Sequence, residues 1–266
     1  MSTQAIGIFD SGVGGTSIWK EIHELLPNES TIYLADSLHA PYGQKKKERI
    51  LELSIKNTEL LIKKDCKLIV VACNTATTNA ISYLRHNYNV PFIGIEPAIK
   101  PAALKTKTKA IGILATKGTL SSELFHNTSE LFAENIEIHE QVGKGLVELI
   151  ESGKKDSSEM TDLLKTYCLP ILEKNIDYLV LGCTHYPYLI PQLKKILPKT
   201  VTIIDSGEAV ARQTKAVLER HDLLNLLARS KKKEVRNISH LFYSNKEVNI
   251  LQDIIGKQFK AEFLKF

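Results

Sequence analysis

The 266-residue sequence is poor in the residues that mark several special classes of protein. It has 4 cysteines, 14 glycines, 9 prolines and 1 tryptophan. The cysteines form no C-x-x-C pair and no zinc-site spacing, and glycine and proline are too few for a collagen-like chain. No apolar run approaches the roughly 18 residues of a membrane span. We therefore expect an ordinary globular protein without a metal site.

The charge balance is nearly even, since 35 Lys and Arg oppose 30 Asp and Glu. Lysine triplets at 45–47 and 231–233 supply part of the excess, and neither is interleaved with aromatic residues. Such runs are typical of solvated faces, so we expect no nucleic-acid partner. The first residues lack the basic and apolar segments of a secretory leader. We expect a cytoplasmic chain with reduced thiols and no membrane contact.

Short apolar runs alternate with segments of helical period, a pattern that predicts α/β units around mostly parallel, doubly wound sheets. The first helical segment places Ile18, Trp19, Ile22, Leu25 and Leu26 on one predicted core face. The runs that we interpret as strands are 5–10, 31–35, 67–72, 91–95, 110–115, 136–141, 178–182, 201–204, 239–243 and 260–264.

The sequence also repeats itself in outline. Ala-Ile-Gly-Ile at 5–8 recurs at 110–113, and Val-Val-Ala-Cys-Asn-Thr at 70–75 resembles Val-Leu-Gly-Cys-Thr-His at 180–185. A third pair, 90–98 and 201–209, follows in the same order. We therefore predict two pseudo-symmetric α/β domains, with the active site in the cleft between them.

Ligands of doubly wound sheets bind beyond the carboxyl ends of the strands. The residues at these places are small and polar, among them Asp10-Ser11-Gly12, Asp36-Ser37, Cys73-Asn74-Thr75, Glu96, Thr116, Cys183-Thr184-His185 and Asp205-Ser206. The glycines at 12–15 suit a tight turn or a phosphate contact, but Ser17 stands where a dinucleotide fingerprint needs glycine.

Two of the cysteines occupy equivalent places in the two halves. Cys66 and Cys168 fit simple core packing. Cys73 and Cys183 each follow an apolar strand and precede a predicted helix start, where the helix dipole lowers the pKa of a thiol. A redox disulfide or a Cys-His hydrolase would use the same residues. Facing cysteines in a cleft also suit racemisation, because one thiolate removes an α-proton while the opposite thiol donates one.

Four segments resemble the signature segments of glutamate racemases, in the aspartate/glutamate racemase superfamily. They are Asp-Ser-Gly-Val-Gly-Gly at 10–15, Pro-Tyr-Gly at 41–43, Ala-Cys-Asn-Thr-Ala at 72–76 and Gly-Cys-Thr-His-Tyr-Pro at 182–187. The resemblance implies an isomerase that interconverts L- and D-glutamate without a cofactor. It also implies a role in supplying D-glutamate for peptidoglycan, and so in cell wall biogenesis and cell shape.

The resemblance also implies roles for individual residues. Cys183 removes the proton from L-glutamate and Cys73 from D-glutamate, while Asp10 and His185 assist and also contact substrate. Glu151 falls where the family has a glutamate that supports the histidine. The remaining residues implied in substrate binding are Ser11, Tyr42, Gly43, Asn74, Thr75, Thr116, Thr119 and Thr184. Tyr42 and Gly43 belong to the turn that receives the side-chain carboxylate.

We expect one domain to comprise residues 1–97 and 207–266, and the other residues 98–206. A racemase of the same superfamily acting on aspartate or another amino acid remains an alternative, as does a non-catalytic two-domain protein that binds a small acid. A cysteine-dependent decarboxylase or amidase would consume its substrate instead of inverting it. The sequence leaves a homodimer open.

Overall fold

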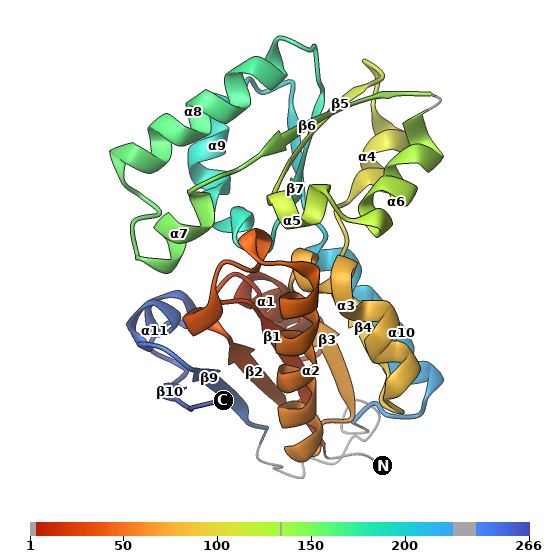
Figure 1. Ribbon diagram of the computed structural model, residues 1–266, viewed down its shortest axis with the longest axis vertical. Coiled ribbons are helices and arrows are strands. Elements are labelled where there is room, and N and C mark those ends of the chain that lie inside the picture. The colour runs from red at the N-terminus through yellow and green to blue at the C-terminus, as the bar shows by residue number, and fades with distance from the viewer. Residues whose placement is uncertain (1–3, 134, 226–237) are drawn as a thin grey trace.

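The structure, a computed structural model, describes residues 4–133, 135–225 and 238–266 and contains two sheets flanked by helices (Figure 1). The lysine triplet at 231–233 lies outside the described residues. All strand pairs among the described residues are parallel. The prediction of an α/β fold with parallel sheets is confirmed, and all ten expected strands are present to within one residue at each end.

The larger sheet has six strands in the order β10-β9-β2-β1-β3-β4. Their bounds are β1 (Ile6–Asp10), β2 (Thr31–Ala35), β3 (Leu68–Val71), β4 (Phe92–Gly94), β9 (His240–Ser244) and β10 (Ala261–Phe263). Alternate side chains of β1 enter opposite layers of the core: Ile6 and Ile8 belong to one cluster and Phe9 to another. Both faces of this sheet are therefore covered, as in other doubly wound folds.

Helices from distant parts of the chain cover the two faces of the larger sheet. Helices α1 (Thr16–Leu25), α10 (Gly207–Arg220) and α11 (Asn249–Ile255) contribute to the cluster that contains Ile6, whereas α2 (Lys47–Lys63) and α3 (Asn74–Asn87) contribute to the cluster of Phe9. Two short 3₁₀ helices, η1 (Ser37–His39) and η2 (Tyr42–Gln44), follow β2. The expected core face of α1 is buried except at Leu25, where the prediction is wrong: this side chain is 39% exposed at the end of the helix.

The smaller sheet has four strands in the order β6-β5-β7-β8. They are β5 (Ala110–Ala115), β6 (Glu137–Val142), β7 (Tyr178–Gly182) and β8 (Thr202–Ile204). The helical segments of this unit are α4 (Ile99–Lys105), α5 (Lys117–Leu120), α6 (Glu123–Ala133), α7 (Leu146–Glu151), α8 (Ser158–Leu172), η3 (Tyr186–Leu189) and α9 (Ile190–Ile196). Residues of α4 and of the 120–125 segment pack on one face of the sheet, and residues of α7, α8 and α9 pack on the other.

The two sheets share one strand order, which explains the repeats in the sequence. The run β2-β1-β3-β4 in the larger sheet corresponds to β6-β5-β7-β8 in the smaller. In the larger sheet, β1 lies between β2 on one side and β3 on the other, and in the smaller sheet β5 lies between β6 and β7 in the same way. The strand order therefore changes direction between β1 and β3 and between β5 and β7. A reversal of this kind leaves a crevice at the carboxyl ends of the strands. Cys73 follows β3 and Cys183 follows β7, so each cysteine lies at the crevice of its own sheet.

The chain passes from the larger sheet to the smaller after β4 and returns after β8 (Figure 1). The two passages are adjacent, because the Ser206 hydroxyl donates a hydrogen bond to the Glu96 carbonyl. After the return, α10 packs against α1, and β9 and β10 extend the larger sheet beside β2. The end of the chain is therefore part of the same unit as its beginning.

Candidate active site

The loop after β1 forms one wall of the site. Asp10 ends the strand and is fully buried, and its carboxylate accepts hydrogen bonds from the backbone N–H of Gly15 (2.8 Å) and from the Ser11 hydroxyl (3.4 Å). Thr184 follows β7 in the other unit, and its hydroxyl also lies 3.4 Å from the Asp10 carboxylate. Burial raises the pKa of Asp10, and the positive charge at His185 opposes this shift.

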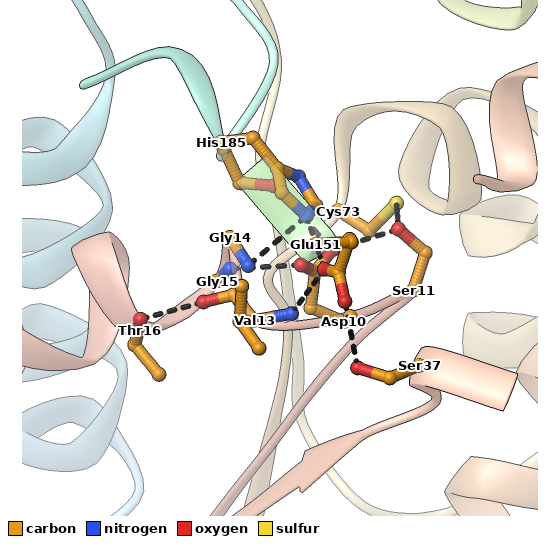
Figure 2. A network of polar contacts seen from close by, with 12 residues as sticks. Asp10, Ser11, Val13, Gly14, Gly15, Thr16, Ser37, Cys73, Glu151 and His185 are labelled. Carbon is orange, nitrogen blue, oxygen red and sulfur yellow. Dashed lines mark hydrogen bonds and ion pairs between the residues drawn. The ribbon is translucent and has the colours of Figure 1, made fainter. Parts of the chain in front are cut away.

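Cys73 stands at the N-cap of α3, next to the Asp10 loop. Its sulfur accepts a hydrogen bond from the backbone N–H of Ala76 (3.5 Å) and lies 3.6 Å from the Ser11 hydroxyl (Figure 2). The expected helix start is present, but the expected lowering of the pKa is wrong. Burial, followed by the nearby Asp10, raises the pKa of Cys73 well above its usual value, and this outweighs the hydrogen bond from the helix end. Cys73 is therefore a neutral thiol at pH 7.

Cys183 differs from Cys73 in its surroundings. Only the short η3 follows it, beginning at Tyr186, so the expected helix N-terminus directly after the cysteine is absent. Its closest polar partner is the imidazole of His185, whose Nδ1 lies 3.8 Å from the sulfur. A negative charge on Cys183 raises the pKa of Cys73, which places the two sulfurs within electrostatic reach of each other.

His185 connects Cys183 to Glu151. The Nε2 atom of the ring lies 2.6 Å from Oε1 of Glu151, which ends α7 (Figure 2). Burial lowers the pKa of His185, but the hydrogen bonds with Cys183 and Glu151 outweigh burial and hold this pKa well above its usual value. Protonated His185 therefore places a positive charge beside the Cys183 sulfur.

The Glu151 carboxylate also reaches from its own unit into the loops of the other. Oε1 accepts a hydrogen bond from the backbone N–H of Val13 (2.6 Å), and Oε2 accepts one from the Ser37 hydroxyl (2.9 Å). Figure 2 shows the carboxylate between His185 on one side and Val13 and Ser37 on the other. Glu151 thus orients the histidine and also links the two units.

Two glycines of the 10–15 loop allow this close approach. A Cβ atom at Gly12 would lie 1.9 Å from Oε1 of Glu151, and one at Gly14 would lie 2.2 Å from Nδ1 of His185. Any other residue at either position would displace the carboxylate or the ring. The sequence alone does not decide whether this glycine-rich loop is a tight turn or a phosphate contact. In the structure, the loop makes room for the side chains of Glu151 and His185 from the other unit.

Three threonine hydroxyls form a cluster where the start of α3 meets the segment after β5. Thr75 in α3 lies 2.8 Å from Thr116 and 3.3 Å from Thr119, and the latter two lie 3.0 Å apart. Thr119 is fully buried, whereas Thr116, at the end of β5, is half-buried. Of the three residues, Thr116 is the least buried, and the Thr119 hydroxyl lies within hydrogen-bond distance of the Thr116 hydroxyl.

Asn74 is buried, with an exposed fraction of 3%, yet neither its amide nitrogen nor its amide oxygen has a hydrogen-bond partner within the described residues. An unpaired buried amide costs free energy unless a ligand completes its hydrogen bonds. Its chain neighbours Cys73 and Thr75 both belong to the site. The structure thus brings an unsatisfied donor and acceptor together with the thiol of Cys73.

Tyr42 and Gly43 lie in η2, beside the threonine cluster. The Tyr42 hydroxyl is buried and donates to the Asp36 carboxylate, and it accepts a hydrogen bond from Asn57 (3.1 Å). This hydroxyl is therefore fully engaged inside the protein. Gly43 approaches Thr116 so closely that a Cβ would lie 2.8 Å from the threonine Cβ. The turn consequently faces the site with its backbone and not with the tyrosine ring.

Sequence reasoning missed some residues of this arrangement. Ser37 and Asp36 appeared among the strand-end residues, but nothing in the pattern indicated which partners they contact. Tyr188 was not singled out at all, although its hydroxyl pairs with Thr16 of the other unit at 2.5 Å. Position after a strand was the available signal for Ser37 and Asp36.

No group of three His, Cys, Asp or Glu residues suited to a metal ion occurs in the part of the chain that the structure describes. A hollow of about 350 Å³ adjoins the site. It is lined by Gly43 and Gln44 from one unit and by Thr116, Val147 and Glu148 from the other, among further residues. The site therefore borders a hollow that both units line, close to the threonine cluster.

Two α/β units with the same strand order each place a cysteine directly after the strand that borders the crevice of their sheet. The family model for Asp/Glu/Hydantoin racemases matches residues 6–214. The chain belongs to this family. It is 47% identical to the glutamate racemase of Ectopseudomonas mendocina, over 84% of this chain and 85% of the relative. It is 44% identical to that of Herpetosiphon aurantiacus, over 85% and 89% respectively.

Solved structures agree with the family assignment. A glutamate racemase isoform of Bacillus anthracis superimposes with a TM-score of 0.84 at 31% identity, over 98% of this chain and 97% of that chain. The Escherichia coli glutamate racemase, solved in complex with L-glutamate and an activator, superimposes with a TM-score of 0.84 at 32% identity and the same coverage. That of Francisella tularensis, in complex with D-glutamate, gives 0.81 at 28% identity, over 99% and 97%.

Proposed function

We propose that this protein is a glutamate racemase that interconverts L- and D-glutamate by means of two thiols. The observation that carries the proposal is the placement of Cys73 and Cys183 at equivalent crevices of two sheets with the same strand order. Relatives 44–47% identical over more than four fifths of the chain are glutamate racemases. Both enantiomers of glutamate occur in structures of similar proteins.

In the proposed reaction, the Cys183 thiolate removes the α-proton of L-glutamate, so that the Cα–H bond breaks and an S–H bond forms. The electron pair stays on the substrate as a carbanion, and the neutral thiol of Cys73 donates a proton to the opposite face. D-glutamate results, with no net oxidation or reduction. The raised pKa of Cys73 supports its role as the acid in this direction, and the charge at His185 supports Cys183 as the base. The reverse reaction exchanges the two roles.

We further propose how the substrate is held. Ser11, Asn74, Thr75 and Thr184 bind the α-amino and α-carboxylate groups, and the backbone at Tyr42 and Gly43, together with Thr116, receives the side-chain carboxylate. The unpartnered amide of Asn74 supports this arrangement, because a bound amino acid would complete its hydrogen bonds. Donors aimed at the α-carboxylate also stabilise the carbanion. Thr119 supports Thr116, and Asp10 and His185 assist the two thiols.

We propose residues 1–97 with 207–266 as one domain and residues 98–206 as the other. No helix among the described residues is both long and apolar enough to cross a membrane. We place the enzyme in the cytoplasm, where its product would serve peptidoglycan synthesis. The known use of D-glutamate by the family supports this placement.

The four cysteines offer a matched test of the proposal. Cys66 and Cys168 are buried thiols away from the site, and burial raises their pKa values to about 12 and about 11. We expect Cys73→Ser and Cys183→Ser each to lower the racemisation of L-glutamate, followed by optical rotation, by at least about 1,000-fold. Cys66→Ser and Cys168→Ser should retain activity. Full activity in either site variant would contradict the mechanism.

A further inference from the structure

A second polar network lies behind the Tyr42 turn and takes no part in the proton transfers. Its centre is Asp36, a fully buried carboxylate directly after β2. Oδ1 pairs with Nδ1 of His39 at 2.7 Å and accepts a hydrogen bond from the amide of Asn245, and Oδ2 accepts the Tyr42 hydroxyl. A buried carboxylate with three donors is held in one position, because losing any donor leaves charge unsatisfied in the interior.

Asn245 brings the end of the chain into this network. It follows β9, lies beyond residues 6–214 that the family model matches, and is 5% exposed. Its amide nitrogen donates to Asp36, and its amide oxygen accepts the backbone N–H of Leu38 at 3.0 Å. The two ends of one amide therefore fix both the carboxylate and η1, the segment that leads into the turn.

The network determines where the turn stands. Because the Tyr42 hydroxyl is bound to Asp36 and Asn57, the ring anchors the turn from inside the protein. Gly43 follows directly and is in close contact with Thr116 of the other unit. A shift of Asp36 would thus move Tyr42, and with it the backbone that faces the site.

We propose that Asp36 and Asn245 are positioning residues that set the distance between the turn and the two thiols, and thereby select glutamate over aspartate. The inference rests on glutamate racemisation as the proposed function. The two amino acids differ by one methylene, so the selection requires that the turn be fixed to well within about 1 Å. Three donors on a buried carboxylate supply this rigidity.

The test compares Asn245→Ala with a control, Asn225→Ala. Asn225 also belongs to the C-terminal part of the chain, but its side chain donates to the Asn28 carbonyl, in the loop between α1 and β2. Kinetic constants for L-glutamate, D-glutamate and L-aspartate are measured together with the affinities for L-glutamate and L-aspartate by calorimetry. Thermal unfolding reports on stability. Asn245→Asp is a second variant that keeps the size and the oxygen facing Leu38 but replaces the donor to Asp36 with a like charge.

For Asn245→Ala we expect the KM for both glutamate enantiomers to rise about tenfold while kcat changes by less than about twofold. The preference for glutamate over aspartate in kcat/KM should fall about tenfold, and Asn225→Ala should keep the wild-type preference. Destabilisation alone would lower the active fraction equally for both substrates. If both Asn245 variants keep the wild-type preference, the inference is wrong. If wild-type protein does not racemise glutamate, the proposed function is wrong. The inference is then tested by calorimetry alone, which compares the affinities of the wild type and the variants for L-glutamate and L-aspartate.

Discussion

Replacing Glu151 with glutamine removes one negative charge from the site but keeps the size and the hydrogen-bonding positions of the side chain. In the structure Oε1 receives both the Val13 N–H and Nε2 of His185, so an amide oxygen at this place keeps both donors. The amide nitrogen would face the Ser37 hydroxyl, which can rotate to accept a hydrogen bond. The positive charge on His185 loses its counter-charge. Glu151→Gln therefore isolates the electrostatic effect of the carboxylate on the Cys183 side of the site.

The expected magnitude follows from the charge-assisted contact at 2.6 Å. Hydrogen bonds to charged groups contribute about 1.5–3 kcal/mol, which corresponds to a loss of about 10- to 150-fold in kcat/KM. The loss must be equal for L- and D-glutamate, because the equilibrium constant of a racemisation is one. The variant slows only the proton transfer at Cys183, which becomes more rate-limiting in both directions. This transfer removes the substrate α-proton of L-glutamate, but in the reaction of D-glutamate it delivers a proton to the carbanion.

Isotope effects with α-deuterated substrates reveal this difference. In Glu151→Gln the primary isotope effect on kcat/KM should increase for L-glutamate, whose α-deuteron goes to Cys183, and decrease for D-glutamate, whose deuteron goes to Cys73. Glu148→Gln is the matched control, because Glu148 lies on the same helix and its carboxylate accepts a hydrogen bond from the exposed Gln44 amide. Its rate should change by less than about twofold. Isotope effects that stay unchanged, or that change alike for both enantiomers, would refute the assignment of Glu151 and His185 to Cys183.

Three further outcomes can be measured. Gly14→Ala should fold but lose about 100-fold or more in racemisation rate, because the added Cβ would lie 2.2 Å from Nδ1 of His185; an active Gly14→Ala enzyme would contradict the packing described. Lys67→Met should lower the free energy of unfolding in urea by about 3–5 kcal/mol, because it leaves the Glu29 carboxylate buried without the ammonium 2.5 Å away, and a change under about 1 kcal/mol would count against this. Burial lowers the pKa of His240 to about 4, so the unfolded chain binds the extra proton between about pH 6.5 and 4, and stability should fall as the pH drops through that range. The free energy of unfolding should fall by about 1–2 kcal/mol, a value lowered to allow for solvent screening of the partly solvated ring. Urea unfolding at pH 7 and pH 4.5 measures this loss, which should be smaller in His240→Phe.

The sequence predicted those parts of the fold that depend on local pattern. All ten strands, the parallel arrangement and the correspondence of the two halves followed from apolar runs of four to six residues and from their repetition. The position of a polar residue after a buried strand indicated Asp10, Cys73 and Cys183 as candidates, because the carboxyl ends of parallel strands meet at one edge.

Features that depend on contacts between distant segments could not be predicted in the same way. The pKa of Cys73 depends on burial and on Asp10, 63 positions away, and these outweigh the helix end that the local pattern suggested. The link from Glu151 to Val13 and Ser37 joins two units, and Asn245 meets Asp36 across 209 positions. No periodicity in the sequence records such pairs.

The exchange of the substrate α-proton with solvent tests the central claim most directly. Purified, reduced protein is incubated with L-glutamate in D₂O without added cofactor, while proton NMR follows the α-proton and polarimetry follows the optical rotation. The two-thiol account predicts that the α-proton signal disappears as the rotation decays to zero, and that Cys73→Ser and Cys183→Ser abolish the decay of rotation. An unchanged α-proton signal with demonstrably folded, reduced wild-type protein would contradict glutamate racemisation by this enzyme.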